Sequence, residues 1–268
     1  SKPFRNRGRG WEMTQVETVA PHDCLGSNLY AHVLRGRFMR AVPRPNEAVN
    51  ETWLSDRDRF SYTGIDSEDR LLKPMVRKGG KWQETDWETA LEAAVSGLRE
   101  ALGKGPDATG VLASPSATAE ELYLLQKLAR GLGLSNIDVR LRQADFRDDA
   151  AEPLFPWLGQ DVQALENLEA ALVIGSNPRK EVPLLAHRLR KAALKGGAVM
   201  FLNPRRYESF FPVAAYSLCS AQEMPAALAA VLKATGKPVP AHLKEFVAAQ
   251  KPDTEQTKIA EQLAKGER

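Results

Sequence analysis

The chain has 268 residues, of which 43% are hydrophobic and 26% are charged, so it can form one large or two modest globular domains. Its 37 basic and 34 acidic side chains are interleaved and leave a net charge of +3, which gives no argument for nucleic acid or an anionic membrane surface as a partner. No apolar run approaches the ~20 residues that span a bilayer, and the two cysteines imply no disulfide framework. No signal peptide opens the chain, and the missing initiator methionine suggests a processed chain or an excised fragment.

Residues 11–65 are rich in β-forming and turn residues and predict a small, mostly antiparallel β-rich domain. Apolar and polar residues alternate loosely over 11–19 and 28–42, with Gly36 at the expected hairpin turn. The next segment, 66–84, is polar and is expected to be a linker with one Lys-Gly-Gly-Lys turn.

From Thr85 the pattern changes to strands that alternate with helices. Thr85 and Glu88 resemble a capping box in which Thr85 is the N-cap of a helix. Five apolar runs follow, most of them separated by helical patterns, which predicts βαβ units and a doubly wound, mainly parallel sheet over 85–235. The apolar runs cover 109–113, 137–141, 171–174, 199–202 and 214–218. The helical patterns cover 118–133, 181–195 and 221–234.

The last segment, 236–268, predicts a helical tail. It begins with two prolines and continues into short helical patterns at 241–249 and 254–265. An α/β domain would be expected to continue into another strand there, so the sequence predicts a fold that is truncated at the C-terminus.

Two loops that follow apolar runs are candidates for ligand binding. They consist of Gly175, Ser176, Asn177 and Pro178, and of Asn203, Pro204 and Arg205. Ligands of open α/β sheets sit outside the carboxyl ends of strands, where helix N-termini and arginine attract phosphate, so the loops could form a nucleotide pocket. The same residue types are common in tight turns, and we favour turns over a pocket by about two to one. No dinucleotide fingerprint or P-loop occurs.

A second candidate is a cryptic metal or thiol site around His22, Asp23 and Cys24. Two strong ligands, His22 and Cys24, make a poor metal site, and no CxxC or HxxxH spacing supports them. A catalytic Cys24 would need an activating base, which the sequence does not identify. We favour a structural role for His22 and Cys24 by roughly nine to one.

Several phrases, taken in order, resemble the large iron–sulfur subunit of respiratory complex I, the NADH:quinone oxidoreductase of bacteria and mitochondria. They are Trp11-Glu, the segment Val19 to Asn28, Arg40-Ala-Val-Pro-Arg44, Asn50-Glu-Thr-Trp53, Asp56-Arg-Asp-Arg-Phe60 and Arg70-Leu-Leu-Lys-Pro-Met-Val-Arg77. The resemblance continues through the two candidate loops to about residue 235. Each phrase alone is weak, and their joint occurrence in order is specific.

This resemblance bears on iron–sulfur binding. Some relatives hold an extra four-iron cluster with C-x2-C-x3-C and a distant fourth cysteine. The matching positions here are Ala20, Asp23, Ser27 and Ser55, and none is a soft sulfur ligand. The resemblance therefore implies no metal and no cofactor in this segment, with the electron-carrying clusters in an N-terminal region of the subunit that this chain lacks.

The same resemblance implies a molybdopterin-oxidoreductase-like fold. In enzymes such as formate dehydrogenase, the equivalents of the two candidate loops hold the cofactor's guanine dinucleotide, whereas complex I carries no molybdenum. We therefore expect a vestigial pocket and a segment that is non-catalytic alone.

Its expected role is structural and docking, in support of electron transfer from NADH to quinone. The expected partners are other peripheral-arm subunits, with no nucleic acid and no direct membrane insertion. The expected location is peripheral, on the cytoplasmic side of the bacterial inner membrane. The alternatives are a pterin- or nucleotide-binding molybdopterin-type oxidoreductase domain and the cryptic metal or thiol site.

Overall fold

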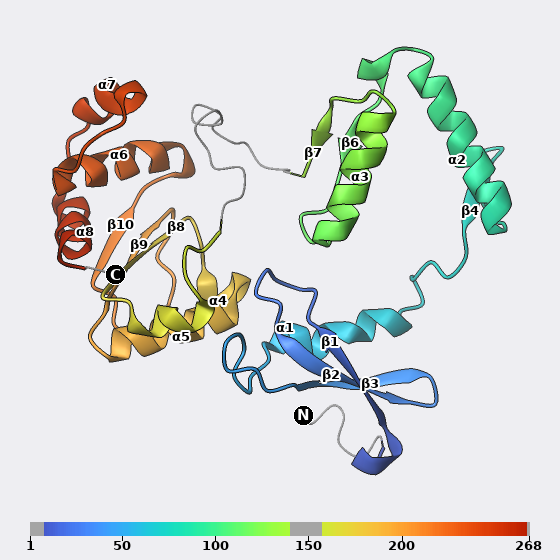
Figure 1. The fold of residues 1–268 in the computed structure, drawn as a ribbon, viewed down its shortest axis with the longest axis horizontal. Coiled ribbons are helices and arrows are strands. Elements are labelled where there is room, and N and C mark those ends of the chain that lie inside the picture. The colour runs from blue at the N-terminus through green and yellow to red at the C-terminus, as the bar shows by residue number, and fades with distance from the viewer. Residues whose placement is uncertain (1–7, 140–156, 267–268) are drawn as a thin grey trace. The chain divides into compact units, whose positions relative to one another are not determined.

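The computed structural model describes residues 8–139 and 157–266 (Figure 1). The described residues of 1–60 and 157–268 form one compact unit, and those of 61–156 form a second. These two units do not coincide with the expected domains at 11–65, 85–235 and 236–268. The bounds of those domains stay a prediction. The expected strand at 137–141 is described only as far as Val139.

The first unit begins with an antiparallel sheet in the order β1-β2-β3. Its strands are β1 (Thr14–Val19), β2 (Asn28–Leu34) and β3 (Arg37–Pro43). Arg35 and Gly36 join β2 to β3 with φ values of 49° and 76°. A two-residue type I′ turn needs positive φ at both central positions, and glycine adopts it without strain. The antiparallel sheet and the turn at Gly36 are therefore confirmed.

The segment after β3 is fastened to the sheet by the buried side chain of Asn50. Its amide oxygen accepts the Asn28 N–H at 2.9 Å, and its amide nitrogen lies 3.2 Å from the Arg44 carbonyl and 3.1 Å from the Trp53 carbonyl. The short helix α1 (Asp56–Phe60) follows and contacts β3. Asn50 thus fixes the path of the chain just before the segment that contains Ser55.

The α/β part of the first unit is built on a parallel sheet in the order β10-β9-β8. Its strands are β8 (Ala170–Ile174), β9 (Ala198–Asn203) and β10 (Ala215–Leu218). Its helices are α4 (Pro178–Glu181), α5 (Pro183–Leu194), α6 (Met224–Thr235), α7 (Lys244–Ala248) and α8 (Thr254–Lys265), with 3-10 turns η5 (Val162–Asn167), η6 (Ala221–Glu223) and η7 (Ala241–Leu243). The central strand β9 is almost entirely buried, as expected for a parallel strand covered on both faces.

Helices cover both faces of this sheet (Figure 1). Side chains alternate along β9, so Phe201 packs in a core cluster with Leu189 of α5, whereas Met200 packs in a second cluster with Val231 of α6 and Ile259 of α8. Together with the parallel pairing, this confirms the predicted doubly wound α/β architecture. The helical patterns of the tail are also confirmed, since α7 and α8 lie within them.

The second unit holds a hairpin, two helices and two short parallel strands. Its elements are η3 (Ser61–Asp66), β4 (Met75–Lys78), β5 (Lys81–Glu84), α2 (Trp87–Leu102), η4 (Pro106–Ala108), β6 (Val111–Leu112), α3 (Ala119–Gly131) and β7 (Ile137–Asp138). β4 pairs with β5 across the Lys-Gly-Gly-Lys turn, and β6 pairs with β7. The segment expected to be a linker therefore contains a two-stranded hairpin.

The N-cap of α2 is Asp86, so the prediction of Thr85 was wrong by one residue. The Asp86 carboxylate accepts the Thr89 N–H at 2.8 Å. This hydrogen bond holds the pKa of Asp86 below its ordinary value, because it favours the charged carboxylate. Aspartate caps a helix at least as well as threonine, and the helix starts where that bond forms.

Apolar side chains at helical spacing on α2 face outward. Trp87 is 71% exposed, and Leu91 and Val95 are also exposed. Trp87 borders an apolar hollow of about 700 Å³ in this unit, together with Leu71, Leu72, Lys73, Pro74, Met75 and Trp82. An apolar area of this kind on a protein surface commonly marks a site of association.

Candidate functional site

The four matching cluster positions lie on two neighbouring segments of the first unit. Ala20, Asp23 and Ser27 belong to the loop between β1 and β2, and Ser55 directly precedes α1. The Ala20 N–H donates to the Ser27 carbonyl at 2.9 Å and closes this loop. Ala20, Ser27 and Ser55 are buried.

Asp58 on α1 is the polar centre of this region, and both of its carboxylate oxygens are engaged. Ser55 Oγ donates to Asp58 Oδ2 at 2.8 Å, and the Asp58 N–H donates back to Ser55 Oγ at 3.0 Å. His22 Nδ1 lies 3.1 Å from Asp58 Oδ1. Asp58 itself is fully buried. The hydroxyl at one of the four matching positions is therefore already used within the chain.

The Asp23 carboxylate is also engaged. It accepts the Leu25 N–H at 3.0 Å and lies 3.3 Å from Arg57 Nη2. Arg57 Nη2 also donates to the carbonyl of Glu181 at 2.6 Å. The β1–β2 loop is thus connected through α1 to α4 in the α/β part of the same unit.

These residues do not fit a four-iron cluster. Ala20 offers no ligand atom, and the hydroxyl of Ser27 is buried without a hydrogen-bond partner among the described residues. Asp23 and Ser55 present hard oxygens that are held by neighbouring groups, whereas such clusters need soft thiolates.

The alternative metal or thiol site receives no support from the geometry. Cys24 is exposed, and His22 and Asp23 face different partners, Asp58 and Arg57. In the part of the chain that the structure describes, no group of three or more His, Cys, Asp or Glu side chains could hold a metal ion. The Ser55–Asp58–His22 chain has its carboxylate in the middle, so it lacks the order of a hydrolytic triad, in which histidine contacts serine.

The two candidate pocket loops lie side by side at the carboxyl ends of β8 and β9. The buried Asn203 donates its amide nitrogen to the Ser176 carbonyl at 2.9 Å. Gly175 adopts a positive φ of 64°, which turns the chain sharply after β8. Strand ends at this edge are where open α/β sheets bind ligands.

Polar groups of the first loop are held by Glu181. The Ser176 hydroxyl donates to Glu181 Oε2 at 2.8 Å, and the Asn177 N–H lies 3.2 Å from Glu181 Oε1. A phosphate would need these same donors. The role of Glu181 was not predicted. Its position four residues after Asn177 is the signal that could have indicated a carboxylate that binds the loop's own donors.

The second loop is organised by the hydroxyl of Tyr216 on β10. That hydroxyl donates to the Arg205 carbonyl at 2.8 Å and accepts the Tyr207 N–H at 3.1 Å. The Arg205 guanidinium lies 5.4 Å from the centre of the Tyr207 ring. The loop is therefore a turn closed by its own contacts.

An ion-pair cluster around the buried Arg188, which the sequence did not reveal, joins the turn after β3 to the α/β part. Arg188 on α5 is 3% exposed and pairs with Glu51 at 3.0 Å and with Glu166. Lys191, one turn later, lies 2.7 Å from Glu51 and 2.9 Å from Glu166. We call Glu51, Glu166, Arg188 and Lys191 the junction cluster.

Charge sets the ionisation of the junction cluster. Burial alone would raise the pKa of Glu166, but hydrogen bonds and charge from Lys191 and Arg188 outweigh it and hold this pKa below its ordinary value. Burial likewise would lower the pKa of Lys191, but Glu51 and Glu166 raise it above its ordinary value. Both groups are therefore stabilised in their charged forms.

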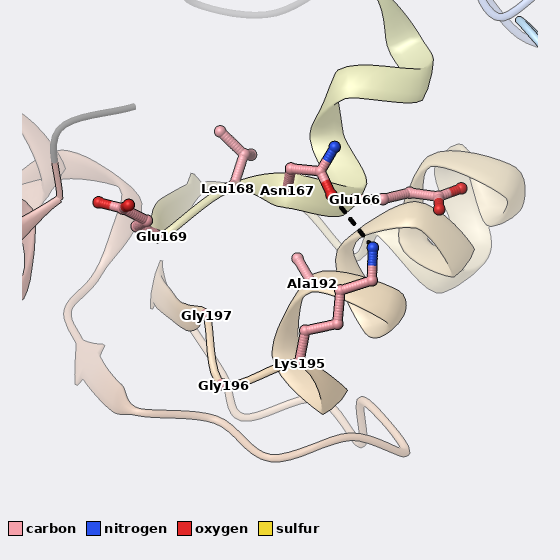
Figure 2. Close-up of a pocket in the computed structure, with 8 residues that line it drawn as sticks. All are labelled: Glu166, Asn167, Leu168, Glu169, Ala192, Lys195, Gly196 and Gly197. Atoms are coloured by element: carbon pink, nitrogen blue, oxygen red, sulfur yellow. Dashed lines mark hydrogen bonds between the residues drawn. The ribbon is translucent and has the colours of Figure 1, made fainter.

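A hollow of about 350 Å³ lies at the opposite end of the sheet (Figure 2). Lys195 Nζ donates to Asn167 Oδ1 at 3.1 Å beside it. Gly197 sits so close to the backbone that an added Cβ would come within 2.3 Å of the Leu168 carbonyl. These residues precede β8 and β9, and the amino ends of parallel strands are not where such sheets bind ligands.

Comparison with known proteins identifies the family. A family model described as molybdopterin oxidoreductase matches residues 70–245, and the chain belongs to that family. A second model, described as the NADH-ubiquinone oxidoreductase NDSU1/NuoG-like 4Fe-4S domain, matches residues 13–63. A domain of this iron–sulfur type thus lies within the chain itself, at the segment that contains the four matching positions Ala20, Asp23, Ser27 and Ser55.

Similar sequences make the resemblance more specific. The 75 kDa subunit of NADH-ubiquinone oxidoreductase from Reclinomonas americana is 32% identical over 213 residues, which cover 73% of this chain and 30% of that protein. The alpha subunit of NADPH-Fe(3+) oxidoreductase from Geobacter sulfurreducens is 35% identical over 211 residues, which cover 77% of this chain and 24% of that protein. An NADH-quinone oxidoreductase protein of Rickettsia conorii is 32% identical over 189 residues, which cover 70% of this chain and 27% of that protein. The predicted resemblance to the large complex I component is confirmed, and the chain spans less than a third of the length of these relatives.

A solved structure supports the fold. Acetylene hydratase from Pelobacter acetylenicus superposes with a TM-score of 0.64 over 93% of this chain and 38% of that chain. Sequence identity is 16%, so the likeness shows the fold alone. The predicted molybdopterin-oxidoreductase-like α/β fold is confirmed.

Proposed function

We propose that this chain is a non-catalytic, structural segment of the large peripheral-arm subunit of an NADH:quinone oxidoreductase of the complex I type. It supports electron transfer from NADH to quinone by packing and positioning, without carrying electrons itself. One observation carries this proposal: the chain's own side chains bind Asp23 and Ser55 at one candidate cofactor site and the donors of Ser176 and Asn177 at the other.

At the first site, Asp58 binds Ser55 and Arg57 binds Asp23, where thiolates would be needed. At the second, Glu181 binds the donors that a phosphate would use. At the first site, releasing these groups would leave the buried Asp58 and Ser55 without partners, which is costly. A ligand therefore has to replace the internal hydrogen bonds of these groups before it can bind them.

We further propose that the partners are other peripheral-arm subunits, on the cytoplasmic side of the bacterial inner membrane. The exposed apolar residues around Trp82 and Trp87 support association, because tryptophan in an apolar hollow is a common anchor of protein interfaces. In the described part of the chain, no helix has the length and apolarity required to cross a bilayer.

The test is an NADH oxidation assay with an artificial electron acceptor, run on this chain alone and on the chain reassembled with the rest of its complex. We expect no turnover by the chain alone and full turnover in the complex. Turnover by the chain alone would contradict the proposal. Normal assembly and turnover of a complex that lacks this whole segment would contradict its structural role.

A further inference from the structure

The matched 4Fe-4S domain poses a physical question about residues 13–63. A bound cluster ties separate backbone segments together through four metal–sulfur bonds. The residues at those positions do not fit a cluster here, yet the β1–β2 loop is closed and its inward residues are buried. Something else must hold this loop against α1.

We propose that Asp58 and Arg57 form a metal-free clasp that takes over the cross-linking role of a cluster in this domain. The clasp consists of two chains of contacts, His22–Asp58–Ser55 and Asp23–Arg57–Glu181 carbonyl. It connects the same two segments that carry the four matching cluster positions. This inference concerns how the domain is held together and does not depend on the complex in which the chain acts.

The first chain of contacts is central to the clasp because Asp58 is a fully buried carboxylate. A buried charge is tolerated only when hydrogen bonds replace water, and here His22 and Ser55 each take one carboxylate oxygen. The Asp58 N–H bond to Ser55 Oγ fixes the serine rotamer as well. Removing the charge therefore loosens the contact between the β1–β2 loop and α1.

The second chain of contacts extends the clasp beyond the domain. The side chain of Asp23 is 4% exposed and that of Arg57 is 37% exposed, so their ion pair is only partly screened by solvent. Arg57 Nη2 also reaches the Glu181 carbonyl, which is 124 residues away in sequence. The domain is thereby fastened to α4 next to the candidate pocket loops.

Hydrogen exchange followed by mass spectrometry tests the clasp in the full chain. We compare peptides covering residues 18–30 in the wild type, Asp58→Asn and Arg57→Ala. Asp56→Asn and Arg59→Ala on the same helix serve as controls of the same residue types. We expect amide exchange in the β1–β2 loop to become about tenfold faster or more in both clasp variants, and to stay unchanged in the controls.

Unchanged exchange in Asp58→Asn and Arg57→Ala would overturn the inference. If Asp58→Asn does not fold, the Arg57→Ala result decides, because its partly exposed side chain is less critical for folding. Anaerobic reconstitution of the wild-type chain with iron and sulfide provides an independent measurement. Retention of about four irons per chain after desalting, with the visible absorption of an iron–sulfur cluster, would show that a metal holds the loop and would equally refute the clasp.

Discussion

Replacing Arg188 with alanine should destabilise the first unit as a whole. Its guanidinium pairs with Glu51 and Glu166 and donates to the carbonyls of Glu47 at 2.6 Å and Val49 at 3.2 Å. These contacts join α5 to the turn after β3. Breaking a buried ion pair costs about 3–5 kcal/mol, because the partner charges stay buried without compensation.

Lys191 limits the expected loss. It remains within 2.9 Å of both carboxylates, so the two acids keep one positive partner, and we expect the lower end of the range, about 3 kcal/mol. At roughly 2–4 °C per kcal/mol for a domain of this size, the midpoint of thermal unfolding should fall by about 6–12 °C. Circular dichroism and urea titration would measure the two quantities.

The matched control is Arg190→Ala, which removes an exposed arginine from the same helix. Its effect should stay within about 0.5 kcal/mol. Equal stability of Arg188→Ala and Arg190→Ala would refute the view that the junction cluster holds the two parts of the unit together.

Three further predictions concern pH, ligands and thiols. Because the pKa of Glu166 is lowered in the folded chain, its contribution to the free energy of unfolding is present above the ordinary glutamate pKa, about 4.3, and is lost as pH falls through the folded-state pKa. Because the pKa of Lys191 is raised, its contribution is lost as pH rises through its folded-state pKa. In Glu166→Gln, the free energy of unfolding should therefore change less with pH in the acid range. An unchanged pH dependence would contradict a stabilising role of the junction cluster. Calorimetric titration with GTP or a pterin dinucleotide should show no binding tighter than millimolar, whereas micromolar binding that Arg205→Ala abolishes would favour a binding enzyme. Iodoacetamide should modify the exposed Cys24 before Cys219, because burial and nearby acids raise the pKa of Cys219; mass spectrometry that finds Cys219 modified first would contradict this.

The sequence predicted local features well because they depend on neighbouring residues. The turn at Gly36, the parallel strands and the tail helices all follow from short-range patterns. The N-cap was misplaced because Thr85 and Asp86 are both good capping residues, and only the position of the Thr89 amide decides between them.

The polar contacts that define both sites could not be predicted in the same way. Arg57 meets Glu181 across 124 residues, and Arg188 meets Glu47 across 141 residues. A charged residue in a sequence carries no mark of burial, and most such residues lie at the surface. Only the folded structure shows that Arg188 reaches the turn after β3 and that Arg57 reaches α4.

The positions of these contacts explain how one unit can be assembled from chain segments that are far apart in sequence. Arg57 fastens the β1–β2 loop and α1 to α4, and Arg188 fastens the turn after β3 to α5. Arginine suits both places because its guanidinium can bind a carboxylate and a backbone carbonyl at the same time. In each case the guanidinium makes both kinds of contact, so a change to lysine, with a compact ammonium, should lose at least one of them. Two arginines, one buried and one partly exposed, therefore make the contacts that hold distant segments of this unit together.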